Sequence, residues 1–149
     1  MIALFLALSF GAALVGSQFM PGAWYAEIAK PSWNPPSWVF GPVWTVLYVL
    51  MAVAAWLVWR AGGGWRGAAV PLGLWLVQLV LNAAWSWLFF GQRRMDLALV
   101  EIVVLWAAIL GCVVLFWRVR PLAGGLMLPY LAWVGFAAVL NGTLWAMNR

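Results

Sequence analysis

Residues 121–148 read PLAGGLMLPYLAWVGFAAVLNGTLWAMN and contain no charged side chain. A helix of ~20 residues crosses the ~30 Å hydrocarbon core of a bilayer, so this stretch is long enough to span a membrane. Four further uncharged stretches precede it, namely residues 1–26, 31–59, 67–92 and the sixteen residues between Glu101 and Arg118. The five stretches predict five transmembrane helices.

The composition agrees with this prediction. Apolar residues make up 68% of the 149 residues and charged residues 7%, against about 45–50% and ~25% in soluble domains. So few charges exclude a soluble enzyme, a nucleic-acid-binding module and a disordered tail. No stretch alternates in polarity as barrel strands do. The net charge of +5 lies at the predicted membrane edges, where it suits lipid headgroups and predicts no nucleic-acid partner.

We predict one all-α domain over residues 1–149, a bundle of five transmembrane helices. The spans cover about residues 2–19, 37–59, 68–90, 95–117 and 121–147. The longest connection, residues 23–37, contains Pro31, Pro35 and Pro36, which exclude regular helix over residues 30–36. Asn34 is a candidate cap for the second helix. Its aromatic residues suit the membrane interface, so we expect this loop to lie against the mouth of the bundle. Four Lys or Arg residues lie on each side of the predicted bundle, so the positive-inside rule does not determine the orientation of the protein in the membrane.

Catalytic and metal-binding patterns are sparse. The chain has no histidine, which removes the commonest metal ligand and general base. Its single cysteine, Cys112, lies within a predicted span. The sequence contains no nucleophile–base combination, phosphate-binding loop or metal cluster, so we predict no metal site and no required cofactor.

Fourteen tryptophans are the most unusual feature of the composition. About half lie near predicted helix ends and fit an interfacial aromatic belt. A buried indole N–H needs a hydrogen-bond partner, and lipid offers none. The tryptophans far from the predicted ends therefore either fill the core or line a cavity for a flat apolar ligand; they are Trp44, Trp75, Trp85, Trp106 and Trp133.

Polar residues inside the predicted spans allow the same two interpretations. Gln78, Asn82 and Ser86 follow one stripe of the third span, with Trp85 beside them. Asn141 shares a stripe of the fifth span with Trp133, and Tyr48 accompanies Trp44 on the second. Polar side chains in a bilayer face the bundle interior, where they either bond across helices or line a cavity.

Glu101 is the only acid well inside a span. An acid in this position is a candidate for proton transfer, which makes a proton-coupled transporter one alternative function. Neutralisation by Arg93, Arg94 or an amide would instead make Glu101 structural.

Three stretches resemble the translocator protein/TspO family, also called the peripheral benzodiazepine receptor or tryptophan-rich sensory protein family. The stretch KPSWNPPSWVFGPVW at 30–44 resembles the family's first loop and second-helix start. LNAAW at 81–85 with FFG at 89–91 resembles the end of its third helix, and PYLAW at 129–133 through Asn141 resembles its fifth. The likeness covers nearly the whole chain in order.

The resemblance implies a five-helix bundle, commonly a homodimer, whose cavity is closed by the first loop. Family members bind porphyrins such as protoporphyrin, sterols and synthetic benzodiazepine-type ligands. Trp44 and Trp133 match tryptophans implicated in light-dependent porphyrin breakdown by bacterial members. Five residues of this chain match other pocket positions of the family: Tyr25, Asn82, Trp85, Ala137 and Leu140. The reasoning on polar residues adds Tyr48 and Asn141 to these candidate ligand-binding residues.

The chain departs from the animal members in the fifth span, where Gly142 and Ala146 stand in place of the Tyr and Arg of the sterol motif. We identify it as similar to a bacterial member in an envelope membrane. The predicted function is a receptor or carrier for porphyrins and other flat hydrophobic ligands, with a sensory or regulatory role in tetrapyrrole metabolism. Two alternatives are a light- and oxygen-dependent porphyrin-degrading enzyme that uses Trp44 and Trp133, and the transporter that uses Glu101.

Overall fold

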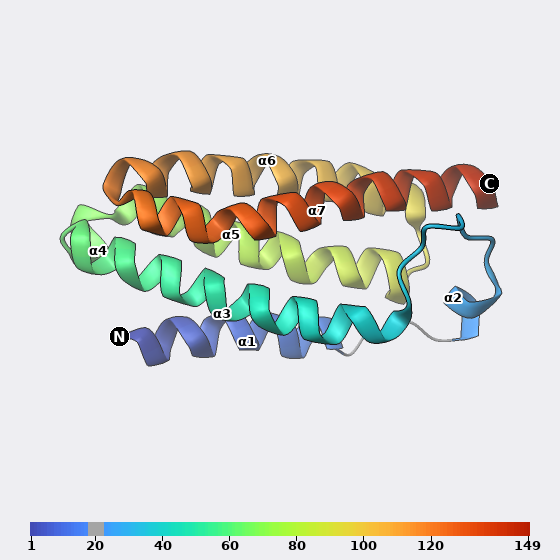
Figure 1. Cartoon of the computed structure of the whole chain (residues 1–149), viewed down its shortest axis with the longest axis horizontal. Helices are drawn as coiled ribbons and strands as arrows, with labels where there is room; N and C mark the ends of the chain where they lie inside the picture. Colours follow the sequence, from blue (N-terminus) through green and yellow to red (C-terminus); the bar gives the residue numbers. More distant parts are fainter. Residues whose placement is uncertain (18–22) are drawn as a thin grey trace.

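The computed structural model describes residues 1–17 and 23–149, and it is helical throughout its regular elements. Five long helices run along one common axis (Figure 1): α1 (Ile2–Ser17), α3 (Ser37–Ala61), α5 (Ala69–Ser86), α6 (Met95–Val119) and α7 (Pro121–Asn148). Three short elements connect them: α2 (Ala23–Glu27), α4 (Gly64–Gly67) and the π-helix η1 (Trp87–Gly91). The predicted all-α, five-helix bundle is confirmed.

Four of these helices are long and apolar enough to cross a membrane, and a shorter apolar helix at Ile2–Val15 accompanies them. The chain is therefore an integral membrane protein. The predicted end of the first span, at residue 19, lies outside the described residues.

The helices pack mainly against their neighbours in the bundle. Helix α6 packs along α7 and α5, while α3 lies between α1 and α7. Figure 1 shows the start of α1, the short helix α4 and the junction of α6 with α7 at one end, and α2 with the chain's C-terminus at the other. Because the bilayer cannot hydrogen-bond exposed backbone, each crossing satisfies its own backbone as a helix.

Several helix boundaries differ from the prediction, among them the end of α6, which continues to Val119. The second span continues to Ala61 and ends at Gly62, before the left-handed Gly63 and Gly64 (φ 87° and 76°). The third span changes at Trp87 from an α-helix to a π-helix. The prediction of Asn34 as a helix cap is wrong, because Pro36 occupies the cap position with no side-chain hydrogen bond. The Asn34 side chain instead binds Tyr25.

The middle of the bundle is packed with large side chains. Trp75 is fully buried and meets Phe5 edge to face, with ring centroids 5.5 Å apart and planes at 88°. Valines and leucines cover much of the outside, which suits contact with acyl chains. Trp75 therefore fills the core, as the first of the two interpretations of the deep tryptophans expects.

Candidate functional site

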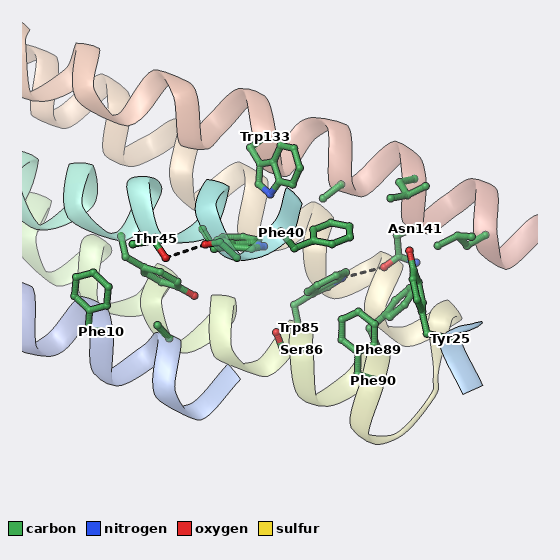
Figure 2. Close-up of a pocket in the computed structure, with 17 residues that line it drawn as sticks. Phe10, Tyr25, Phe40, Thr45, Trp85, Ser86, Phe89, Phe90, Trp133 and Asn141 are labelled. Atoms are coloured by element: carbon green, nitrogen blue, oxygen red, sulfur yellow. Dashed lines mark hydrogen bonds between the residues drawn. The ribbon is translucent and has the colours of Figure 1, made fainter. Parts of the chain in front are cut away.

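A cavity of about 320 Å³ lies toward the α2 end of the bundle, bounded by α1, α3, α5 with η1, α7 and the first loop (Figure 2). This volume is at the lower end of the ~300–1,000 Å³ typical of small-molecule sites. Aromatic and small apolar side chains form most of its wall. The lining residues are Phe10, Ala13, Tyr25, Phe40, Gly41, Trp44, Thr45, Tyr48, Trp85, Ser86, Phe89, Phe90, Trp133, Ala137, Leu140, Asn141 and Leu144.

Two tryptophans from different helices meet at this cavity. Trp44 of α3 and Trp133 of α7 contact edge to face, with ring centroids 6.5 Å apart and planes at 89°. Tyr48 lies one turn from Trp44, with its ring 5.7 Å away, and Phe40 packs against Trp133 at 6.0 Å. These four rings line the cavity, and an accessible aromatic face stacks favourably on a planar guest.

A third tryptophan is held in place by hydrogen bonding. The Trp85 indole N–H donates to the Asn141 side-chain oxygen over 3.0 Å, and the Asn141 amide donates to the Met95 carbonyl over 2.9 Å. The Trp85 ring also stacks on Phe89, with centroids 5.1 Å apart. Asn141 therefore connects α5, α6 and α7 and fixes the orientation of Trp85 at the cavity wall.

A buried polar network connects the cavity wall to the core. The Tyr48 hydroxyl donates to the Asn82 side-chain oxygen over 2.6 Å, and the Asn82 amide donates to the Tyr130 hydroxyl over 2.8 Å. Tyr130 in turn donates to the Gln78 side-chain oxygen over 2.7 Å. The network joins α3, α5 and α7, and each hydroxyl that it buries has a partner, as buried polar groups require.

This network changes the role expected of Asn82. The sequence places Asn82 among the ligand-binding residues, but it is absent from the cavity lining, and its amide already bonds Tyr48 and Tyr130. The other predicted positions do line the cavity: Tyr25, Trp44, Tyr48, Trp85, Trp133, Ala137, Leu140 and Asn141. Asn82 holds Tyr48 in position behind the wall.

The first loop lies over the cavity, as predicted. The Tyr25 hydroxyl donates to the Asn34 side-chain oxygen over 3.1 Å, and its ring packs against Phe90 at 5.6 Å. Burial raises the pKa of Tyr25, while the bond to Asn34 acts in the opposite direction. The phenol is therefore protonated near neutral pH, as its donor role requires.

The loop is also attached to the last turn of α7. The Asn148 amide nitrogen donates to the Ala29 carbonyl and its oxygen accepts the Ala29 backbone N–H, each over 2.8 Å. The Trp33 ring meets Phe136 at 5.8 Å. These contacts hold the loop across the end of the bundle where Tyr25 closes the cavity.

The sequence reasoning missed several wall residues. Phe10 and Ala13 line the cavity from α1, three residues apart and so on one helix face, and Phe40 lies one turn before Trp44. Helical spacing from Trp44 is the signal that could have found Phe40. Of the deep tryptophans, Trp106 is not in the lining and donates its N–H to the Leu131 carbonyl over 3.2 Å.

Several buried polar groups have no hydrogen-bond partner in the described part of the chain. They are the indole N–H groups of Trp59, Trp75 and Trp133, the Ser9 hydroxyl and the two carboxylate oxygens of Glu101. Of these residues, only Trp133 belongs to the cavity lining. The alternative of a Glu101 neutralised by Arg93, Arg94 or an amide is not found among the described residues; Arg94 pairs with Asp96 at 3.0 Å instead. Glu101 does not line the cavity.

The lining residues given above include no charged side chain. Among the described residues, no group of His, Cys, Asp and Glu is placed to hold a metal ion. Hydrophobic contact and a few neutral hydrogen-bonding groups are the interactions that this cavity offers to a guest.

Comparisons with known proteins agree on one family. The model of the TspO/MBR family matches residues 1–146. The human translocator protein is 47% identical over 139 residues, covering 91% of this chain and 82% of the relative. The tryptophan-rich protein TspO of Chlorobaculum tepidum is 42% identical over 152 residues (99% and 95%), and the tryptophan-rich sensory protein of Cereibacter sphaeroides is 37% identical over 144 (97% and 89%). The chain thus belongs to the TspO/MBR family of integral membrane proteins.

Proposed function

We propose that this protein is a membrane receptor or carrier that binds flat hydrophobic ligands in its aromatic cavity, with porphyrins as the leading class. Its role is then sensory or regulatory in tetrapyrrole metabolism. One observation carries the proposal: indole rings from three helices, those of Trp44, Trp85 and Trp133, line one cavity. Large rigid rings around an apolar hollow bind a planar guest at low conformational cost.

The polar groups at the wall support the same class of ligand. The unpaired N–H of Trp133 provides a donor for which no described residue provides an acceptor. A buried donor without an acceptor costs free energy, and a guest that places a ring nitrogen or carbonyl oxygen beside the Trp133 N–H removes this cost. The lining contains no histidine to bind an iron, so a free-base macrocycle fits it better than haem held through its metal. Charged substituents of the guest would lie outside the uncharged wall.

Replacing Trp133 with leucine should weaken protoporphyrin binding up to about tenfold, because one aromatic contact contributes ~0.5–1.5 kcal/mol beyond its area. Quenching of tryptophan fluorescence during a titration in detergent measures the affinity. Trp117→Leu is the matched control, because Trp117 is 51% exposed and lies outside the cavity lining. Equal affinities for the two variants would count against a site in this cavity.

A second candidate function is light-dependent porphyrin breakdown. The contact between Trp44 and Trp133 at the cavity favours it, because two readily oxidised indoles would lie beside the bound ring. An illuminated porphyrin and dioxygen would supply the oxidant, and the indoles would take part in opening the macrocycle.

This candidate has its own test. Illumination of the purified protein with protoporphyrin in air should produce a new absorption spectrum. The product should disappear in Trp44→Phe and Trp133→Phe, which keep a ring but lose the indole, and persist in Trp117→Phe. Bleaching at the same rate in all variants would show that these indoles are not catalytic.

Three further predictions remain open. Homodimer formation and a bacterial origin rest on the resemblance alone, and similar identities to human and bacterial relatives favour neither source. Proton-coupled transport has the unpaired carboxylate of Glu101 in its favour. However, Glu101 does not line the cavity, so that mechanism lacks a contact between the acid and the guest.

A further inference from the structure

One end of the bundle carries an uncompensated group of arginines. It contains the turn after α3, the short helix α4 and the junction of α6 with α7 (Figure 1). Its cations are Arg60, Arg66, Arg118 and Arg120, all exposed. We call this group the arginine end.

Close packing at the turn brings these arginines to one place. A Cβ at Gly62 would lie 3.4 Å from Val119 Cγ1, and a Cβ at Gly67 would overlap the Gly62 carbonyl oxygen. The turn between Gly62 and Gly67 is therefore tightly closed and lies against the junction of α6 with α7. Arg60 precedes this turn and Arg66 lies within it, while Arg118 and Arg120 flank Val119.

The acids lie toward the opposite end. All three acidic residues of the chain belong to α2 or to the first two turns of α6. There Asp96 pairs with Arg94 at 3.0 Å, and the Lys30 ammonium donates to two backbone carbonyls, those of Ala26 and Ile28. Arg93 and Arg149 of that end have no ion pair with a described residue, but its four cations share the end with all three acids, whereas the four cations of the arginine end have no acid beside them.

The cations of the arginine end have no such partners. Arg60 lies 5.0 Å over the ring of Trp56, and Arg66, Arg118 and Arg120 make no side-chain hydrogen bond or ion pair with any described residue. Their guanidinium groups keep the planar donor geometry that binds phosphate oxygens in pairs. Trp65 and Trp117 are 39% and 51% exposed beside them, as is typical of side chains at headgroup level.

We propose that the arginine end binds the phosphodiester headgroups of anionic phospholipids, such as phosphatidylglycerol, in the leaflet that it faces. A phosphate brings the negative charge that this end lacks, and the acyl chains then lie along the apolar outside of the bundle. The interaction is independent of the cavity and of any guest in it.

Native mass spectrometry of the full chain in neutral detergent tests this proposal. Phosphatidylglycerol and phosphatidylcholine with the same acyl chains are titrated separately. The double variant Arg118→Gln/Arg120→Gln should bind phosphatidylglycerol about 25-fold more weakly, because each arginine near the surface contributes about fivefold. Affinity for phosphatidylcholine should stay unchanged.

The matched control is Arg93→Gln/Arg149→Gln, which removes two exposed charges from the opposite end. It should keep most of the phosphatidylglycerol affinity. Equal losses in the two double variants, or equal wild-type affinity for both lipids, would overturn the proposal. Displacement of the lipid by an equal concentration of glycerol phosphate would also overturn it, because a free phosphate site would then be present. Unchanged melting temperatures confirm that both variants fold.

Discussion

Asn82→Leu is expected to destabilise the protein by about 2–3 kcal/mol, a large effect for one substitution in a membrane helix. The leucine removes the acceptor of the Tyr48 hydroxyl and the donor to the Tyr130 hydroxyl, both of which are buried. Leaving a buried polar group unsatisfied costs ~1–3 kcal/mol. Hydrogen bonds between membrane helices average less, ~0.6 kcal/mol, because the reference state also finds partners. The Tyr48 hydroxyl is left without a partner, and Tyr130 loses one bond but keeps Gln78 as its acceptor; the two losses together give the stated value.

The apparent melting temperature in detergent micelles measures this loss, and a double variant provides its control. In Asn82→Leu/Tyr48→Phe the hydroxyl that lost its acceptor is also removed, so part of the stability should return. Tyr48→Phe alone should cost less than Asn82→Leu, because it leaves Asn82 bonded to Tyr130. Strictly additive losses in the double variant would mean that the two residues do not depend on each other in the folded protein.

Ala137→Leu should reduce protoporphyrin affinity by about 5- to 150-fold, which corresponds to the ~1–3 kcal/mol cost of overfilling a packed site. Ala137 lies one turn after Trp133 on α7, is 9% exposed and contributes to the cavity wall. A leucine there takes up part of a cavity of only about 320 Å³ and pushes a planar guest away from the rings.

Ala132→Leu is the control for this prediction, because Ala132 lies on the same helix but is exposed on the outside of the bundle. Its affinity for protoporphyrin should match the wild type. Fluorescence quenching measures both affinities, and circular dichroism checks that both variants keep their helices. If Ala137→Leu binds as tightly as Ala132→Leu, the ligand occupies another place, and the proposal for this cavity fails.

The helices follow directly from the sequence. Uncharged stretches of sufficient length must form helices in a bilayer, because no water is present to bond the backbone. The boundaries were predicted to within a few residues, with Pro121 at the start of α7 and glycines after α3. The π-helix at Trp87–Gly91 was not predicted, because its five residues are all apolar or glycine and show no periodicity that would reveal a wider turn.

The cavity wall was predicted well where an aromatic residue lies on the same stripe as a polar one. Trp133 and Asn141 are an example, since both line the cavity from α7. Spacing alone does not separate two residues of the same type. Asn82 and Asn141 both lie inside spans, yet only Asn141 lines the cavity; Trp75 and Trp85 share α5, yet Trp75 fills the core.

The amino-acid sequence alone thus determined that the chain crosses the membrane as five helices and that it carries an unusual set of indoles and amides within them. The tertiary structure decided which of these side chains meet around a hollow and which are used to hold the helices together. The physical reason is that lipid and protein interior are both apolar. In a soluble helix the polar face marks the outside, whereas here the rotation of each helix depends on its packing against all the others.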